Sequence, residues 1–381
     1  MTPPSSSPGP PDSRVALVHD WLTGMRGGER ALEAICELYP EAERFALLHV
    51  SGSASSAITG RGVRTSFLQR FPGGRHYYRS LLPLFPTAIE QFDLDDVDLV
   101  ISTSHCAAKS VVTPGRTRHL CYCFTPMRYA WDQFDAYFGP ERVGTGTSHL
   151  LRWQLNRLAR WDAATASRVD RYVAISQYVS GRIRRYYNRT SSVVYPPVDT
   201  AYFQPSGAEP EGYLLVVSAL VPYKRVDLAI AAAAAVGMPL RIVGTGPELT
   251  RLRSDAGADV RFLGSLPDAE VRSAYQGATA VLLPGIEDFG IVPVEAQACG
   301  RPVVALGQGG ACETVVDGET GALADEMTAE ALADGINRVR GRRFDTAAIR
   351  RHAERFSRAR FQEGLQREVA SLMAQPIEVG A

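Results

Sequence analysis

The chain has 381 residues, and its 41 basic and 41 acidic side chains give a formal net charge of zero. A nucleic-acid partner calls for an excess of positive charge, so we do not expect one for this neutral chain. The length is sufficient for two domains of ordinary size.

The chain begins with a segment rich in Pro, Ser and Gly, Met1 to Ser13, which predicts a disordered leader. The leader has neither a basic start nor an apolar core, so we do not read it as a secretion signal. Strands and a helix are expected to alternate after it, which predicts a Rossmann-like domain over 14–205. The strands are expected over 15–19, 45–50, 99–103, 119–124 and 172–175, and the helix over 29–38.

Polar residues follow two of these strands at their carboxyl ends, where parallel sheets bind ligands. Asp20 and Trp21 follow the first strand, and His105 follows the strand over 99–103. A histidine that caps the next helix would give the same pattern as a binding residue. Gly27 and Gly28 precede the first helix and would let the backbone come close to an anion at the start of that helix.

The second half of the chain alternates more regularly and predicts a second doubly wound parallel sheet over 206–357. A proline-rich stretch over 195–212 is the natural hinge before it. Strands are expected over 213–220, 240–244, 260–264 and 280–284, and helices over 226–236, 247–255 and 268–277. A last helix is expected over 358–374.

Two glutamates flank the junction between the last of these strands and the next helix. Glu287 precedes that helix, Pro293 suits its first position and Gly300 its end, so Glu295 is expected in its first turn. A helix N-terminus favours a bound phosphate, and two carboxylates beside it can bond hydroxyls. The arrangement fits a sugar nucleotide, although acidic residues are also common in first turns for helix stability alone.

The distribution of lysine singles out one more residue in this half. Lys109 and Lys224 are the only lysines in the chain, while every other basic residue is arginine. A compact ammonium differs usefully from a guanidinium as a point charge on a phosphate. Lys224 also follows the carboxyl end of a strand, so we expect it to contact a phosphate.

These motifs together resemble the retaining glycosyltransferases of family 4, which have the two-domain GT-B fold with two Rossmann-like domains facing a cleft. The resemblance covers nearly the whole chain after the leader. Its marks are Glu287 and Glu295, the run from Val217 through Ser218 to Lys224 and Arg225, the run 243–248 with Gly244, and 27–29. One departure is Ala219, where family members often carry arginine beside the glycine that comes before the lysine. Either Arg225 replaces the charge of that arginine or the affinity for the donor is lower.

The resemblance also implies roles for individual residues. It implies that Glu295 holds the ribose hydroxyls and that Lys224 holds the diphosphate. Glu287 and the backbone of Phe289, Gly290 and Ile291 would hold the donor sugar, with Leu266 against the base. His105 would bond a sugar hydroxyl or the phosphate.

The segment from Cys121 to Asp132 resembles a block found in a bacterial branch of the family, which includes O-antigen and exopolysaccharide mannosyltransferases acting on lipid carriers. Phe124 stands where that block usually has histidine. Arg128 and Asp132 are acceptor-site candidates with Asp20 and Trp21, unless Arg128 and Asp132 form a structural ion pair. GDP-mannose is the donor that the branch implies, with a UDP-sugar and another acceptor as the alternative.

The charge distribution favours an acceptor at a membrane. Divided at Pro205, the chain has 23 basic and 18 acidic residues before that point and 18 basic and 23 acidic after it. Six arginines and no acid lie between Arg44 and Ala88, and the part over 67–85 interleaves them with aromatic and leucine residues, as in segments that rest on anionic membranes. A solvated loop is the alternative. We expect a cytoplasmic protein, peripheral on the inner face of the cell membrane.

No cofactor and no metal are expected, because lysine, arginine and the helix end would neutralise the diphosphate. A nicotinamide site at 244–249 is disfavoured because Leu249 replaces the third glycine of that motif. Two rivals remain open. A glycosidase would use paired carboxylates without a nucleotide, and an epimerase or binder of similar fold would need no acceptor.

Overall fold

The computed structural model describes residues 13–71, 73, 78–132 and 134–376. The chain divides into two compact units, the first formed by 1–197 with 361–381 and the second by 198–360. The predicted leader lies outside the described residues but for Ser13. Part of the arginine-rich segment over 67–85 also lies outside them.

Unit 1 is built on a parallel sheet of seven strands in the order β3-β2-β1-β4-β5-β6-β7. The direction of winding reverses between β1 and β4, so the loops after these two strands meet at the carboxyl end of the sheet. The strands are β1 (Val15–His19), β2 (Glu43–Ala46), β3 (Arg64–Thr65), β4 (Leu99–Ser104), β5 (Arg118–Cys123), β6 (Arg171–Ala174) and β7 (Ser191–Val193).

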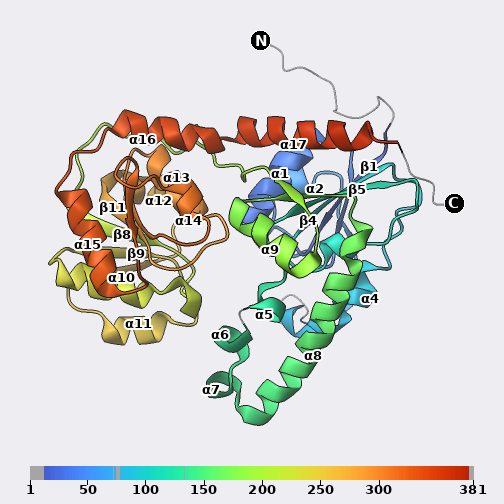
Figure 1. Ribbon diagram of the computed structural model, residues 1–381, viewed down its shortest axis with the longest axis horizontal. Helices are drawn as coiled ribbons and strands as arrows, with labels where there is room; N and C mark the ends of the chain where they lie inside the picture. Colours follow the sequence, from blue (N-terminus) through green and yellow to red (C-terminus); the bar gives the residue numbers. More distant parts are fainter. Residues whose placement is uncertain (1–12, 72, 74–77, 133, 377–381) are drawn as a thin grey trace. The chain divides into compact units, whose positions relative to one another are not determined.

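Helices cover both faces of this sheet (Figure 1). One face carries an apolar core that joins β1 and β4 to α4 and α8, and the other face carries α1 and α17. The described helical segments are α1 (Gly27–Leu38), α2 (Ser56–Thr59), η1 (Phe67–Arg70), η2 (Tyr78–Leu84), α4 (Phe85–Ile89), η3 (Ala108–Ser110), α5 (Arg128–Trp131), α6 (Phe134–Phe138), α7 (Pro140–Val143), α8 (Thr145–Ala164), η4 (Thr165–Arg168), α9 (Gln177–Tyr187) and α17 (Arg358–Met373).

The last helix, α17, begins in unit 2 and belongs to unit 1 from Phe361 onward. The ring of Phe361 meets Tyr122 of β5 edge to face at 5.3 Å between centroids, and Gln362 bonds the carbonyl of Ala34 in α1. Arg171 pairs with Glu368 farther along the helix. These contacts make α17 part of the core of unit 1.

Unit 2 is a second parallel sheet, with six strands in the order β10-β9-β8-β11-β12-β13. The helices α10 and α15 pack on one face through an apolar cluster rich in alanine, leucine and valine (Figure 1). The strands are β8 (Tyr213–Val217), β9 (Leu240–Val243), β10 (Val260–Gly264), β11 (Ala278–Leu283), β12 (Val303–Leu306) and β13 (Gly321–Ala324). The described helical segments are η5 (Pro222–Lys224), α10 (Val226–Ala235), α11 (Leu249–Asp255), α12 (Asp268–Gly277), α13 (Ile291–Ala298), α14 (Ala311–Thr314), α15 (Ala329–Arg340), α16 (Thr346–Ala353) and η6 (Glu354–Phe356).

The prediction of two Rossmann-like sheets is confirmed, but the boundary between the units differs from the expected one at 205. The chain leaves unit 1 after Pro197, because Val198 already bonds the carbonyl of Phe356 and Phe203 is buried in unit 2. The proline-rich hinge over 195–212 therefore contains several residues that anchor unit 2.

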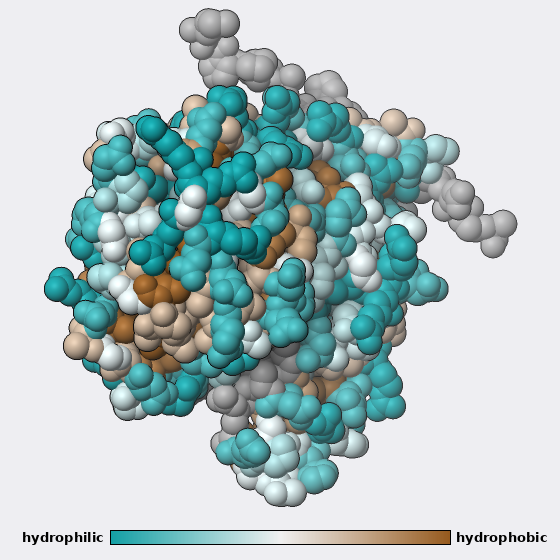
Figure 2. Space-filling view, turned by 60° about the vertical axis from the view of Figure 1, so that its left-hand side comes forward, coloured by the Kyte–Doolittle hydropathy of each residue, from teal (hydrophilic) through white to brown (hydrophobic). Residues whose placement is uncertain are grey.

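The surface that Figure 2 presents is largely hydrophilic, with smaller hydrophobic spots between the polar residues. No helix within the described residues is long and apolar enough to cross a bilayer. Large hydrophobic side chains are nevertheless exposed at a few described positions, which are Phe71, Leu84, Val112, Leu150, Trp153 and Leu263.

Candidate functional site

The predicted donor-site residues of unit 2 gather at the carboxyl end of its sheet. The strand order reverses between β8 and β11, which is the point at which open parallel sheets bind ligands. Lys224 lies in the loop after β8, and Glu287 lies in the loop after β11. The topology therefore brings together residues that are far apart in the sequence.

The glycines after β9 are required by close packing between two loops. Gly244 has φ +134°, and a Cβ atom there would lie 1.8 Å from the carbonyl oxygen of Ser218. A Cβ atom at Gly246 would lie 2.3 Å from the carbonyl oxygen of Leu220. The 244–246 backbone thus lies directly on the loop that follows β8, where Ser218 and Lys224 are found.

Lys224 and Glu287 form an ion pair between the two loops at the switch point. Their side chains are only 17% and 13% exposed, so water screens the pair incompletely. The backbone of Glu287 is also fixed, because its carbonyl accepts a hydrogen bond of 2.8 Å from the N-H of Gly310. The ammonium predicted to hold a diphosphate is therefore held by a carboxylate of the same site.

Arg225 was expected to supply the charge that Ala219 lacks, but its guanidinium is bonded to another group. Its Nε and Nη2 atoms bond the carboxylate of Asp227 at 3.0 to 3.3 Å, and Nη1 contacts the sulfur of Met327 at 3.4 Å. Arg225 also has a left-handed backbone, φ +51°, and caps α10. The charge of Arg225 is thus already neutralised by Asp227.

The helix after Glu287 starts earlier than predicted. Gly290 is its N-cap with φ +90°, and α13 runs from Ile291 to Ala298. Pro293 is therefore the third helical residue instead of the first. A missing N-H still costs nothing at the third position, because the first four N-H groups of a helix have no partner within it. The expectation that Glu295 lies in the first turn is wrong, since Ile291 opens the helix. The expected stop at Gly300 is confirmed, with φ +76° just after the helix.

Glu295 lies in the second turn and accepts a hydrogen bond of 2.9 Å from the hydroxyl of Tyr275, which is itself buried. This bond orients one carboxylate oxygen. Of the other predicted donor residues, Phe289 turns its ring into the core against Phe356, so only its backbone is available to a ligand. Leu266 is partly buried in the loop after β10.

Asp20 in unit 1 has a different environment from the acceptor contact that we expected. Its carboxylate is completely buried and accepts four backbone hydrogen bonds of 2.6 to 3.0 Å from the segment 105–108. It also faces Nδ1 of His105 at 3.0 Å. Burial alone would raise the pKa of Asp20, but the charge and hydrogen bonds of His105 outweigh it and lower the pKa to about 2. Asp20 therefore fastens the loop after β4 to the end of β1.

His105 remains partly exposed beside an aromatic cluster. Its side chain is 31% exposed, and its ring lies edge-on to Trp21 at 4.5 Å and 6.3 Å from Phe124. Phe124, in place of the usual histidine, also lies 3.4 Å from where a Cβ atom of Gly28 would be. Trp21 is buried against Tyr78 and Phe85, so it acts mainly as a wall of this cluster.

The acceptor candidate Asp132 forms an ion pair with a residue of another helix. Its partner is Arg182 of α9, which is largely buried and also donates a hydrogen bond of 3.3 Å to the carbonyl of Pro126. The neighbouring Trp131 stacks on Tyr186 at 4.8 Å. This part of the block is thus anchored to α9.

Sequence reasoning missed a buried network behind this block. The ammonium of Lys109 forms an ion pair with Oδ1 of Asp162 at 3.0 Å, and both side chains are at most 1% exposed. The other carboxylate oxygen accepts from the indole of Trp131 and the hydroxyl of Tyr187. The rarity of lysine was a signal for Lys109, but its partner could not be known without the fold.

Among the described residues, no group of three or more His, Cys, Asp or Glu side chains is placed so that it could hold a metal ion.

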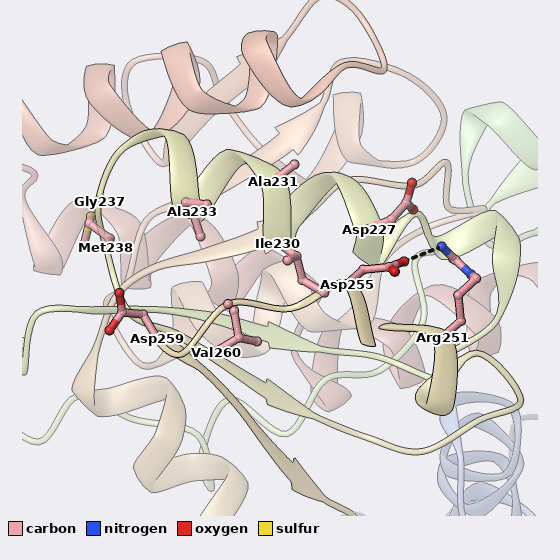
Figure 3. A pocket seen from close by; sticks show the side chains of 12 residues that line it. Asp227, Ile230, Ala231, Ala233, Gly237, Met238, Arg251, Asp255, Asp259 and Val260 are labelled. Atoms are coloured by element: carbon pink, nitrogen blue, oxygen red, sulfur yellow. Dashed lines mark hydrogen bonds and ion pairs between the residues drawn. The ribbon is translucent and has the colours of Figure 1, made fainter. Parts of the chain in front are cut away.

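One pocket lies away from the predicted donor site. A shallow pocket lies between α10 and α11, and Figure 3 shows alanines lining it with Asp227, Asp255 and Asp259. Arg251 is paired with Asp255 at its rim, so the pocket presents mainly small and acidic side chains.

The sequence of unit 2 is similar to a known protein family. Residues 198–355 match the family described as Glycosyl transferases group 1. Unit 2 is therefore similar in sequence to the group 1 glycosyltransferases. The matched range is almost the same as the compact unit over 198–360.

Two curated relatives are similar to parts of the chain. It is 30% identical over 235 residues to a GDP-mannose-dependent alpha-(1-6)-phosphatidylinositol monomannoside mannosyltransferase of Mycolicibacterium smegmatis, covering 52% of this chain and 60% of the relative. It is 35% identical over 178 residues to a D-inositol 3-phosphate glycosyltransferase of Frankia alni, covering 39% of this chain and 44% of the relative. The matches thus span less than two thirds of these relatives.

Solved structures share the whole fold. Anabaena HepE in complex with UDP and glucose superposes with a TM-score of 0.66 at 20% identity, covering 94% of this chain and all of HepE. The apo form of the lipopolysaccharide outer core galactosyltransferase WaaB gives a TM-score of 0.64 at 17% identity, covering 94% and 99%. The chain therefore has the GT-B fold.

Proposed function

We propose that the protein is a retaining glycosyltransferase that moves a hexose from a nucleotide-diphosphate sugar to a lipid-linked saccharide in cell-surface polysaccharide synthesis. The observation that carries the proposal is the Lys224–Glu287 pair at the switch point of a domain similar in sequence to the group 1 glycosyltransferases. An ammonium beside a carboxylate there offers a cation for the diphosphate and an acceptor for sugar hydroxyls.

The donor is proposed to bind along the loops of unit 2. Lys224 would hold the diphosphate, and the backbone N-H groups at the start of α13 would add donors to it. Glu295, oriented by Tyr275, would accept the ribose hydroxyls, and Glu287 would accept those of the transferred sugar. The close approach of Gly244 to Ser218 would leave room for the nucleotide backbone above both loops.

In this proposal the chemistry depends on stabilising the departing diphosphate. Charge that develops on the leaving group would be met by Lys224 and by preorganised N-H groups, which are already in place before reaction. The acceptor hydroxyl would attack on the face from which the diphosphate leaves, so the anomeric configuration would be retained. Glu287 then has no need to form a covalent bond to the sugar.

GDP-mannose is our first choice of donor. The mannosyltransferase of Mycolicibacterium smegmatis is named as dependent on GDP-mannose, which supports this choice. A UDP-sugar is the alternative, because HepE has the same fold and was solved with UDP and glucose. No metal is proposed, since lysine and the helix end can neutralise the diphosphate.

The acceptor is proposed to be handled by unit 1 at the membrane. His105 and Arg128 would contact it, while Trp21 shapes the aromatic cluster and Asp132 and Asp20 hold the surrounding loops. The excess of basic over acidic residues before Pro205 supports a peripheral position on the anionic inner face of the cell membrane.

The first test is thermal stabilisation of the purified chain by GDP, UDP, ADP and dTDP. A ligand at about 100 times its dissociation constant adds roughly 2.7 kcal/mol to stability. We expect one diphosphate to stabilise selectively, and Glu295→Ala to remove most of that effect. Glu330→Ala, at an exposed position in α15, is the control.

The second test separates the proposed reaction from its rivals. Purified protein is given the selected nucleotide sugar with and without a lipid-linked acceptor. Transfer only with the acceptor supports the proposal. Epimerisation of the donor without any acceptor would favour an epimerase, and hydrolysis of an oligosaccharide without nucleotide would favour a glycosidase.

A further inference from the structure

Helix α8 of unit 1 carries an outward face that the donor site and the acceptor block do not use. Its inner side packs into the core through Leu155 and Leu158, with Leu151 against the same cluster. On the opposite side, Leu150 is 57% exposed and Trp153 is 56% exposed. These are the two most exposed large hydrophobic side chains among the described residues, and both lie on one helix.

The spacing places two arginines on the same face. Residues 150, 153, 157 and 160 follow the 3, 4, 3 spacing that lines up side chains along one side of an α-helix. Arg157 and Arg160 are exposed, and the guanidinium of Arg157 lies over the ring of Trp153 at 5.2 Å. We call Leu150, Trp153, Arg157 and Arg160 the α8 stripe.

The charge within α8 has a single sign before its buried end, and one of its arginines, Arg152, pairs with exposed Asp135 of α6. From Arg142 to Trp161 the sequence has four arginines and no acidic residue. Asp162, the next acid, is completely buried and is bonded to Lys109. An exposed helix face with Trp, Leu and Arg and without acid matches a lipid surface with anionic headgroups better than a protein partner, for which acidic rim residues are also common.

A neighbouring segment packs into the same core on the same face of the sheet. The α4 helix and the η2 segment before it pack into the same core as α8, and Trp161 of α8 bonds Glu90 just after α4 at 3.1 Å. Two more exposed hydrophobic side chains, Phe71 and Leu84, belong to this arginine-rich segment. Four of the six large exposed hydrophobic side chains among the described residues thus lie on the layer that covers one face of the sheet.

We propose that the α8 stripe is the surface by which unit 1 rests on an anionic lipid bilayer. The first turns of α8, with α6 and α7, extend away from the sheet of unit 1 (Figure 1), and the four side chains of the stripe are exposed. Trp153 and Leu150 enter the headgroup region, and Arg157 and Arg160 contact anionic headgroups. This inference deepens the proposed function, because it names the surface that would bring the protein to a lipid-linked acceptor. Only the identity of that acceptor rests on the proposed function.

The test measures co-sedimentation of the full chain with phosphatidylcholine vesicles, with and without phosphatidylglycerol, in the absence of any nucleotide sugar. We expect binding only to the anionic vesicles, and weaker binding as salt rises. Arg157→Gln should weaken binding about fivefold, because a basic residue at such a surface contributes roughly 1 kcal/mol. Leu150→Ser with Trp153→Ser should abolish most of the binding.

Matched controls keep the result specific to the stripe. Val112→Ser removes another exposed hydrophobic side chain, and Arg261→Gln removes an exposed arginine of unit 2; both should leave vesicle binding unchanged. Unchanged melting temperatures would show that the variants fold. The proposal is overturned if the wild type ignores anionic vesicles, if the stripe variants bind as well as wild type, or if they only dissociate a dimer.

This test and the donor test fail independently. Loss of vesicle binding with normal stabilisation by a nucleoside diphosphate would leave the glycosyltransferase proposal intact. Vesicle binding through the α8 stripe without any stabilisation by nucleotides would support the proposed membrane-binding surface and refute the proposed donor site.

Discussion

The ion pair between Lys224 and Glu287 makes a prediction that runs against simple loss of function. Glu287→Gln keeps the shape of the side chain and removes the negative charge that now neutralises Lys224. A bare nucleoside diphosphate should therefore bind more tightly to the variant, because it no longer competes with a carboxylate for the ammonium and no longer meets that carboxylate's repulsion. Sugar transfer should fall, since the amide accepts hydroxyl hydrogen bonds less strongly than the carboxylate.

The magnitude follows from the burial of the pair. Unit charges about 4 Å apart interact by roughly 4 kcal/mol at an effective dielectric constant of about 20. Exposed pairs contribute only about 0 to 1 kcal/mol in practice. With exposures of 17% and 13%, this pair lies between those cases. We expect a gain of about 1 to 2 kcal/mol, or roughly 5- to 30-fold in affinity for the diphosphate.

Isothermal titration calorimetry with the diphosphate selected by the stabilisation screen measures this effect. Lys224→Ala should weaken binding, and Glu330→Gln, at an exposed site in α15, should leave it unchanged. The reasoning is refuted if Glu287→Gln weakens diphosphate binding as Lys224→Ala does. That outcome would mean that Glu287 positions Lys224 instead of competing with the ligand.

Three further predictions concern stability. Gly244→Ala should lower the free energy of unfolding in urea by about 3 kcal/mol or more, because the added Cβ atom would overlap the carbonyl of Ser218. Gly257→Ala is the control, since a Cβ atom there meets nothing within 4 Å. Equal effects of the two substitutions would contradict the packing argument. Because the pKa of Asp20 is lowered to about 2, its ionised carboxylate stabilises the folded protein by roughly 2 kcal/mol above pH 4, and this stabilisation is lost as the pH falls towards 2. Asp20→Asn should remove this contribution to the pH dependence of the urea midpoint between pH 4 and 2. An unchanged slope in the variant would argue against the role given to Asp20. Burial lowers the pKa of His119 to about 4, so as the pH falls the unfolded chain binds a proton at this residue before the folded chain does. The free energy of unfolding should therefore decrease from pH 6.5 to 4. His119→Gln should reduce this slope, and a slope equal to that of the wild type would refute the assignment.

Unit 2 could be anticipated from sequence because its elements are local and regular. The strand over 260–264 and the helix over 268–277 match β10 and α12 in both bounds. Each ends at a glycine, a residue whose preference for turns is visible in the sequence. The start of α13 was placed too late because Pro293 is tolerated anywhere in the first turn, while the true start depends on the left-handed Gly290.

Unit 1 was harder to anticipate because its helices depend on distant partners. The buried side of α8 includes Ser148 and Asp162, which interrupt the apolar pattern that would predict a helix. Ser148 is satisfied by the carbonyl of Phe138, and Asp162 by Lys109. Similarly, the position of Asp20 suggested a contact with a ligand, yet its carboxylate accepts hydrogen bonds from the backbone of 105–108. The sequence does not show that these two segments lie together.

Most of α17 belongs to unit 1, and this limits the order in which the protein can fold during synthesis. Unit 1 takes its first residues from the start of the chain, but its core includes Phe361, Leu365 and Val369 near the end. A ribosome therefore completes every residue of unit 2 before it supplies the helix that covers Tyr122. The unit that begins to emerge first must wait, with part of one face of its sheet uncovered, until the unit inserted within it has been made.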